Sequence, residues 1–146
     1  MSNYFDTLQA GQRITGQPFS PTRESIREFC EASLDFNPLH LDDNYMKGSF
    51  GKTTFDGIIM HGMNNFGVIS RMMTDWLYAN GGVHRRLETR WKKPVKPGDT
   101  ITPAAVVTAL RRTERSRWAT LDVVVTNQRG ETVATGEAMV EFPPAQ

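Results

Sequence analysis

The densest group of chemically active side chains lies at residues 35–42, which read Asp-Phe-Asn-Pro-Leu-His-Leu-Asp. Asp35 and His40 are five positions apart around a proline turn, so their side chains can converge on one point. A carboxylate and an imidazole that share one water molecule can act as general base and general acid. Alternatively, Asp35 and Asn37 only form the turn and His40 is a surface histidine. These residues alone leave both interpretations open.

A second candidate is Gly62, within the segment Ile-Ile-Met-His-Gly-Met at residues 58–63. A glycine at the start of an apolar helix leaves backbone N–H groups without intrahelical partners, and the helix dipole adds partial positive charge there. Such groups can form an oxyanion site for a carbonyl that gains negative charge. Taken alone, however, this segment favours an ordinary helix start with a glycine chosen for tight packing.

Basic side chains form two groups that can bind the phosphates of a nucleotide-like carrier. They are Arg85, Arg86, Arg90, Lys92, Lys93 and Lys96, and then Arg111, Arg112, Arg115 and Arg117. For any single residue, a solvated strand face or hairpin is the favoured interpretation, because Lys and Arg also protect exposed sheet edges.

Methionines and potential metal ligands also gather in the first half of the chain. Met46, Met60, Met63, Met72 and Met73 can line an adaptable pocket, but methionines more often fill gaps in a core. His40, Asp42 and His61 are metal ligands by type, yet their spacing matches no known metal motif. We therefore expect no metal site.

The elements that must position these residues are helices first and strands afterwards. We expect a short strand at 12–19, a helix with Ser20 as N-cap that stops near Leu34, and a structured loop with one helical turn at 43–60. Residues 63–78 are apolar around most of a helix, which predicts burial on nearly all sides before Asn80-Gly81-Gly82 ends it. Strands are expected at 83–92, 101–110, 118–126 and 132–142, with Pro103 at an edge or bulge. This order predicts an α+β domain with an apolar helix wrapped by an antiparallel sheet.

Composition excludes several classes of protein. The chain has 146 residues, close to one domain, and we treat 1–146 as a single domain. Its net charge of +1 argues against nucleic acid and against a polybasic membrane anchor. The single cysteine, Cys30, forms no intramolecular disulfide and is best explained as core packing. The start is unlike a signal peptide and no apolar run is long enough to span a membrane, so we expect a cytoplasmic protein.

Three motifs together resemble the MaoC-like, or (R)-specific enoyl-CoA hydratase, family. They are residues 35–42, the segment from Ile58 through Met63, and Arg-Trp-Lys-Lys-Pro-Val-Lys-Pro-Gly-Asp at 90–99. The resemblance covers roughly residues 19–142. It implies a hot-dog fold, with a long central helix wrapped by the sheet, and a homodimer that binds an acyl-CoA thioester near its interface.

The resemblance also implies roles for individual residues. Asp35 and His40 would be the catalytic pair, and Gly62 would supply the oxyanion-hole N–H. The substrate-binding residues would be Asn37, Ser70 and His61. No metal or other cofactor is expected.

The expected reaction is reversible hydration of a trans-2-enoyl-CoA to the (R)-3-hydroxyacyl-CoA, a hydro-lyase activity. A hot-dog acyl-CoA thioesterase and a non-catalytic acyl-binding partner subunit of a heteromeric dehydratase are the alternatives. Two departures from the family concern the acyl group. The segment between Asp42 and His61 is several residues longer than in compact members, and Asn64-Asn65 is polar where the family is often apolar. The asparagines suggest a polar or branched acyl group.

Overall fold

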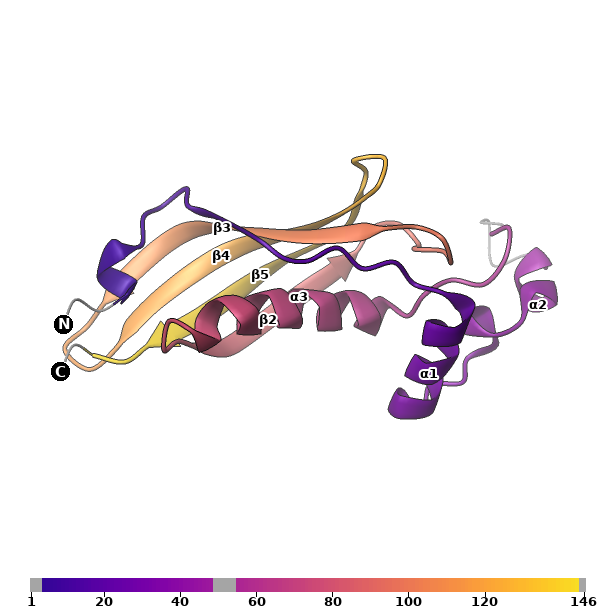
Figure 1. Ribbon diagram of the computed structural model, residues 1–146, viewed down its shortest axis with the longest axis horizontal. Helices are drawn as coiled ribbons and strands as arrows, with labels where there is room; N and C mark the ends of the chain where they lie inside the picture. Colours follow the sequence, from indigo (N-terminus) through magenta and orange to yellow (C-terminus); the bar gives the residue numbers. More distant parts are fainter. Residues whose placement is uncertain (1–3, 49–54, 145–146) are drawn as a thin grey trace.

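The computed structural model describes residues 4–48 and 55–144, and this part of the chain is built on a five-stranded antiparallel sheet with one long helix along it (Figure 1). The sheet order is β1-β3-β4-β5-β2. The elements are η1 (Tyr4–Thr7), β1 (Arg13–Thr15), α1 (Arg23–Ser33), η2 (Pro38–His40), α2 (Asp43–Lys47), α3 (Gly62–Tyr78), β2 (Val83–Trp91), β3 (Ile101–Arg112), β4 (Arg117–Asn127) and β5 (Thr132–Phe142). The α+β class expected from the sequence is confirmed.

The long strands β3, β4 and β5 supply one wall of the core. Along β4, Leu121, Val123 and Val125 are buried while Asp122 between them is exposed, as alternation in a strand requires. Pro103 lies in β3 just beyond the ladder with β1, which ends at Thr15 paired with Ala104, so this side of Pro103 is locally an edge, as expected. After the end of β1, the Gly16 N–H donates to the Pro103 carbonyl at 2.9 Å.

Helix α3 packs one face on this sheet. Its buried residues include Val68, Ile69, Met72, Met73 and Leu77. The expectation of burial on nearly all sides is wrong, since the side chains of Met63 and Tyr78 are 52% and 89% exposed. A single sheet covers only one side of the helix, which leaves the other side to solvent within one chain.

Strand β2 is an edge strand, and this limits its burial. Leu87 packs against the core, but Val83 and Trp91 are 47% and 55% exposed. Of the three residues expected on the buried face of this strand, only Leu87 is therefore turned into the core. An irregularity in the pairing with β5 between His84 and Arg86 also shifts the register there.

Helix α1 starts later than the sequence suggested. Its N-cap is Thr22, not Ser20, because the Thr22 hydroxyl accepts from the Ser25 N–H and the Ser25 hydroxyl accepts from the Thr22 N–H. The helix ends as expected before Leu34, which adopts a left-handed conformation with φ of 59°. The expected strand at 12–19 shortens to β1 plus a bridge between Phe19 and Ile101. In the expected loop, α2 is the one helical turn, and residues 49–54 lie outside the described part.

These elements bring the candidate residues to one end of the molecule. Helices α1 and α2 lie beyond the end of the sheet, close to the start of α3 (Figure 1). The turn that carries Asp35 and His40 follows α1, and Gly62 begins α3. The three motifs of the sequence therefore meet where the helical end adjoins the sheet.

Candidate active site

The turn between α1 and α2 is held by its own polar side chains. The Asp35 carboxylate accepts from the Asn37 N–H at 3.2 Å, and the Asn37 side-chain oxygen accepts from the Leu39 N–H at 3.2 Å. Asn37 thereby caps η2. The turn-forming interpretation of Asp35 and Asn37 is thus correct as far as it goes, but His40 is only 6% exposed and is not a surface histidine.

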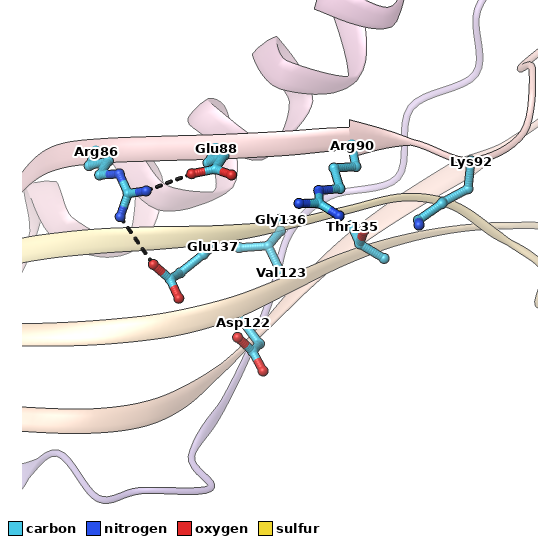
Figure 2. A pocket seen from close by; sticks show the side chains of 9 residues that line it. All are labelled: Arg86, Glu88, Arg90, Lys92, Asp122, Val123, Thr135, Gly136 and Glu137. Carbon is cyan, nitrogen blue, oxygen red and sulfur yellow. Dashed lines mark hydrogen bonds and ion pairs between the residues drawn. The ribbon is translucent and has the colours of Figure 1, made fainter.

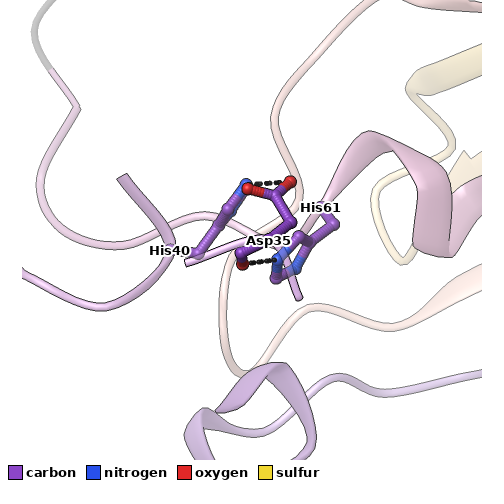
Figure 3. A group of neighbouring side chains, drawn as sticks. All are labelled: Asp35, His40 and His61. Atoms are coloured by element: carbon purple, nitrogen blue, oxygen red, sulfur yellow. Dashed lines mark hydrogen bonds and ion pairs between the residues drawn. The ribbon is translucent and has the colours of Figure 1, made fainter. Parts of the chain in front are cut away.

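The ring of His40 has a fixed orientation and tautomer. Its Nδ1 lies 2.7 Å from the Ile59 carbonyl oxygen, which can only accept, so Nδ1 carries the proton. Its Nε2 then presents a lone pair and lies 3.9 Å from Asp35 Oδ2 (Figure 3). Burial lowers the pKa of His40 below its ordinary value of 6.5, and the nearby His61 adds to this, against the opposing effects of Ile59 and Asp35. His40 is therefore a neutral base at pH 7, facing a carboxylate.

His61 lies behind this pair and is 1% exposed. Its ring stacks on that of His40 with centroids 3.6 Å apart, and Phe29 packs near it at 4.6 Å. Its Nε2 lies 3.2 Å from the backbone oxygen of Asp35 (Figure 3) and 3.5 Å from Cys30 Sγ. His61 thus connects the start of α3 to the backbone of Asp35 and to the ring of His40.

Cys30 has no feature of a nucleophile. It is fully buried, and burial together with the charge of Asp35 raises the pKa of its thiol. Core packing, as expected from the sequence, remains the best account of this residue.

The site contains metal-ligand side chains in a geometry that suits a metal poorly. Asp35, His40 and His61 have ligand atoms within 4.8 Å of one another. However, the two imidazoles are stacked with an interplanar angle of 19°, so their lone pairs lie in two nearly parallel planes and do not point at one common ion. Asp42, the third ligand type considered from the sequence, instead caps α2 by accepting from the Asn44 and Tyr45 N–H groups.

A cavity of about 400 Å³ joins the turn to the start of α3. Its lining includes His40, Gly62 and Asn65, together with apolar side chains and two lysines: Leu39, Phe55, Ile59, Met60, Trp91, Lys92, Lys93, Pro94 and Val95. A second cavity of about 460 Å³ is lined by Arg23, Glu24, Arg27, His40, Leu41 and Ile58. His40 is therefore reached from two sides.

The packing interpretation of Gly62 is supported directly, and its position is compatible with the proposed oxyanion role, which stays a prediction. A Cβ there would lie 2.5 Å from Trp91 Cε2, so glycine is needed for packing. As the first residue of α3 it has no intrahelical acceptor for its N–H, and it lines the same cavity as His40. Ser70, two turns further and about 12 Å along the helix axis, is partly buried and is not among the residues that line this cavity.

Sequence reasoning missed one contributor to the site, and it linked a second, Asn65, to the acyl group without placing it in the cavity. The Ile59 carbonyl orients His40, and no pattern of side-chain types marks a backbone acceptor. Asn65 lines the cavity and is 3% exposed. The helical spacing could have placed it there, because Asn65 lies three and four positions before the buried Val68 and Ile69 and so shares the core-facing side of the helix.

Three residues of the basic segment, Arg86, Arg90 and Lys92, line a shallow groove on the outer surface of the sheet. There Arg86 pairs with Glu88 and Glu137 at 2.5 and 3.2 Å (Figure 2). Arg90 and Lys92 line the same shallow groove without an ion pair to any described residue. Acidic side chains interleave with the basic ones, as on a solvated strand face, and the phosphate-binding role stays a prediction.

The family profile and the similar proteins of known name point to the same family. The profile of the MaoC like domain matches residues 7–129. An (R)-specific enoyl-CoA hydratase of Aeromonas caviae is 36% identical over 118 residues, which are 81% of this chain and 84% of that protein. Another (R)-specific enoyl-CoA hydratase, from Rhodospirillum rubrum, is 30% identical over 141 residues, or 97% of this chain and 92% of that one.

Solved structures agree with this. The (R)-hydratase from A. caviae involved in PHA biosynthesis has a TM-score of 0.80 at 32% identity, covering 94% of this chain and 98% of that one. This likeness confirms the expected hot-dog fold. In the described residues, no helix has the length and apolar character needed to cross a membrane.

Proposed function

Because the chain belongs to the family of MaoC-like domains, we propose that it is a hydro-lyase that reversibly hydrates a trans-2-enoyl-CoA to the (R)-3-hydroxyacyl-CoA. Relatives support the general activity, since two are named (R)-specific enoyl-CoA hydratase and one of Methylorubrum extorquens, 28% identical, 3-hydroxybutyryl-CoA dehydratase. The observation that carries the proposal is the separation of 3.9 Å between Asp35 Oδ2 and the Nε2 of His40.

That separation suits a water molecule between the two groups. It is too long for a direct hydrogen bond but lets one water donate to both the carboxylate and the unprotonated Nε2. As the water oxygen bonds to C3, one of its protons moves to His40, and the C2–C3 π electrons shift toward the thioester oxygen. Transfer of that proton from His40 to C2 then completes the addition, with no net change in the enzyme.

The negative charge of the enolate-like intermediate requires a donor. Gly62 lines the cavity with His40 and begins α3, so its N–H and the helix dipole can stabilise the thioester oxygen. Water and substrate supply every atom of the reaction, and we propose that no metal or redox cofactor takes part.

We also propose that the protein acts as a cytoplasmic homodimer. Large apolar side chains are exposed beside the turn, at Leu34, Phe36 and Leu41, and near the start of α3 and along the edge strand β2, at Met63, Val83 and Trp91. A second copy would cover such surface, and the mass of the purified protein in solution tests this.

The test of the activity is the loss of conjugated enoyl absorbance with crotonyl-CoA, followed by chiral analysis of the product. Asp35→Asn and His40→Gln should each lower kcat by about 100-fold to 10,000-fold, the usual size of a general acid–base contribution. Wild-type rates in either variant would refute the assignment. Release of free thiol without hydration would indicate the thioesterase, and inactivity that a copurifying second chain repairs would indicate the partner subunit.

A further inference from the structure

Asn65 is a polar side chain of α3 that the proposed reaction does not use, although it lines the cavity where the reaction would occur. It is 3% exposed, and its side-chain oxygen is buried without a hydrogen-bond partner among the described residues. A buried polar atom left unpaired is costly, and native proteins rarely keep one without a reason. Within residues 4–48 and 55–144, the other such atoms belong to His61 and Arg117, and neither residue lines this cavity.

Asn65 lies in a mostly apolar cavity wall, whose other polar side chains are His40, Lys92 and Lys93. Leu39, Ile59, Met60 and Val95 are among the apolar side chains that line the cavity. No carboxylate lines it in the described part of the chain. An acyl chain that extends along α3 through this space therefore meets mostly apolar contacts before it reaches Asn65.

The position of Asn65 relative to Gly62 sets where on the acyl chain this contact falls. Asn65 is three residues after Gly62, which places it one turn along the same side of α3. With the thioester oxygen at the Gly62 N–H, a chain that extends along the helix passes Asn65 a few atoms beyond the reacting C3.

We propose that Asn65 is a specificity-determining residue and that the natural substrate is an enoyl thioester whose acyl chain carries a hydroxyl group a few atoms beyond C3. A hydroxyl suits the site because it donates to the free amide oxygen and can also accept from an amide N–H. A carboxylate can only accept, so it leaves the buried oxygen unpaired. This inference rests on the proposed hydratase function and narrows its substrate class.

The experiment compares two enoyl-CoA substrates of equal size. 5-Hydroxypent-2-enoyl-CoA and hex-2-enoyl-CoA differ only in a hydroxyl against a methyl group at the end of the chain. A longer pair, 6-hydroxyhex-2-enoyl-CoA and hept-2-enoyl-CoA, varies the reach, and 4-carboxybut-2-enoyl-CoA tests an anionic end. The wild-type protein should favour the hydroxylated member of at least one pair by tenfold or more in kcat/KM, because sites built to bind a hydroxyl discriminate strongly against analogues that lack it.

Two variants then test whether Asn65 causes this substrate preference. Asn65→Leu should remove it or reverse it, by raising the use of the methyl substrate and lowering that of the hydroxylated one. Asn64→Leu is the matched control, since Asn64 neighbours Asn65 but does not line the cavity, and its ratio should stay at the wild-type value. A wild-type preference for the methyl or the carboxylate substrate, or a ratio that Asn65→Leu leaves unchanged, overturns the proposal.

The outcomes also separate this inference from the hydratase function. If the wild-type protein hydrates none of these substrates and not crotonyl-CoA, the function itself is wrong. If it hydrates the members of each pair at equal rates, the function stands and the role of Asn65 falls. Should Asn65→Leu fail to fold, the wild-type ratios still decide the substrate class. In addition, the side-chain amide resonances of Asn65 in the wild-type protein should shift with the hydroxylated product and not with its methyl analogue.

Discussion

His61→Phe tests how the catalytic turn is held in place. Phenylalanine keeps an aromatic ring between Phe29 and His40 but cannot donate to the backbone oxygen of Asp35, which His61 Nε2 approaches at 3.2 Å. The unpaired carbonyl is partly buried, so the free energy of unfolding should fall by about 1–2 kcal/mol. For a chain of this length, the melting temperature should drop by roughly 3 °C for each kcal/mol.

The catalytic effect should be larger than the effect on stability. Without its bond to His61, the Asp35 backbone can shift relative to His40, and a misplacement of about 1 Å costs up to about 100-fold in rate. We therefore expect kcat for crotonyl-CoA to fall by about 10-fold to 100-fold with little change in KM. The acid limb of the pH–rate profile should also move to higher pH, because His61 helps to lower the pKa of His40.

Cys30→Ala is the control for packing around His61. Cys30 is fully buried and its Sγ lies 3.5 Å from His61 Nε2, but it does not bond to the turn. This variant should lose stability by about 1 kcal/mol and keep kcat within about twofold. A His61→Phe variant that melts lower yet retains wild-type kcat would refute the positioning role. A raised KM with unchanged kcat would instead support the substrate contact suggested by the sequence.

Three shorter predictions concern pH, packing and backbone conformation. Burial lowers the pKa values of His40 and His84 below 6.5. The unfolded chain therefore binds more protons, and the free energy of unfolding measured with urea should be flat above pH 6.5 and fall below it, less so in His40→Gln. Gly62→Ala places a Cβ 2.5 Å from the Trp91 ring, so the start of α3 and its N–H should shift and kcat/KM should fall at least about 10-fold with a change in tryptophan fluorescence; an unchanged rate would contradict the packing constraint at Gly62. Leu34→Gly removes a left-handed leucine that is 77% exposed, and calorimetry should show a gain of up to about 1 kcal/mol, whereas a loss would mean that the leucine side chain packs against another copy.

The sequence predicts the parts of this site that depend on local rules. The five-residue spacing around Pro38 indicates correctly that Asp35 and His40 come together, because a proline turn constrains the chain over that distance. The pattern of a glycine before an apolar helical segment likewise predicts that Gly62 lies at the start of a helix, which is where α3 begins. Both signals lie within a few residues and need no knowledge of the rest of the fold.

What the sequence could not predict depends on contacts between distant segments. The tautomer of His40 is set by the Ile59 carbonyl, nineteen positions away, and the packing of Gly62 by Trp91 from the edge strand. The expected burial of the helix at 63–78 failed for the same reason, because an apolar pattern does not show how many faces a single chain covers. The N-cap of α1 was misplaced because Ser20 and Thr22 are equally plausible caps until the reciprocal bonds with Ser25 are seen.

The first turn of α3 has two separable tasks in this arrangement. His61 bonds back to the catalytic turn, while Gly62 and Asn65 line the cavity on the substrate side. The acid–base pair itself lies on a different element, the turn after α1, and its geometry depends on Ile59 and His61 but not on Asn65. A change at Asn65 should therefore alter which acyl chain is accepted without altering the protonation of His40, whereas a change at His61 should do the reverse. Because the two residues are only four positions apart at the start of α3, opposite kinetic signatures would show that neighbouring positions at one helix end serve catalyst and substrate separately.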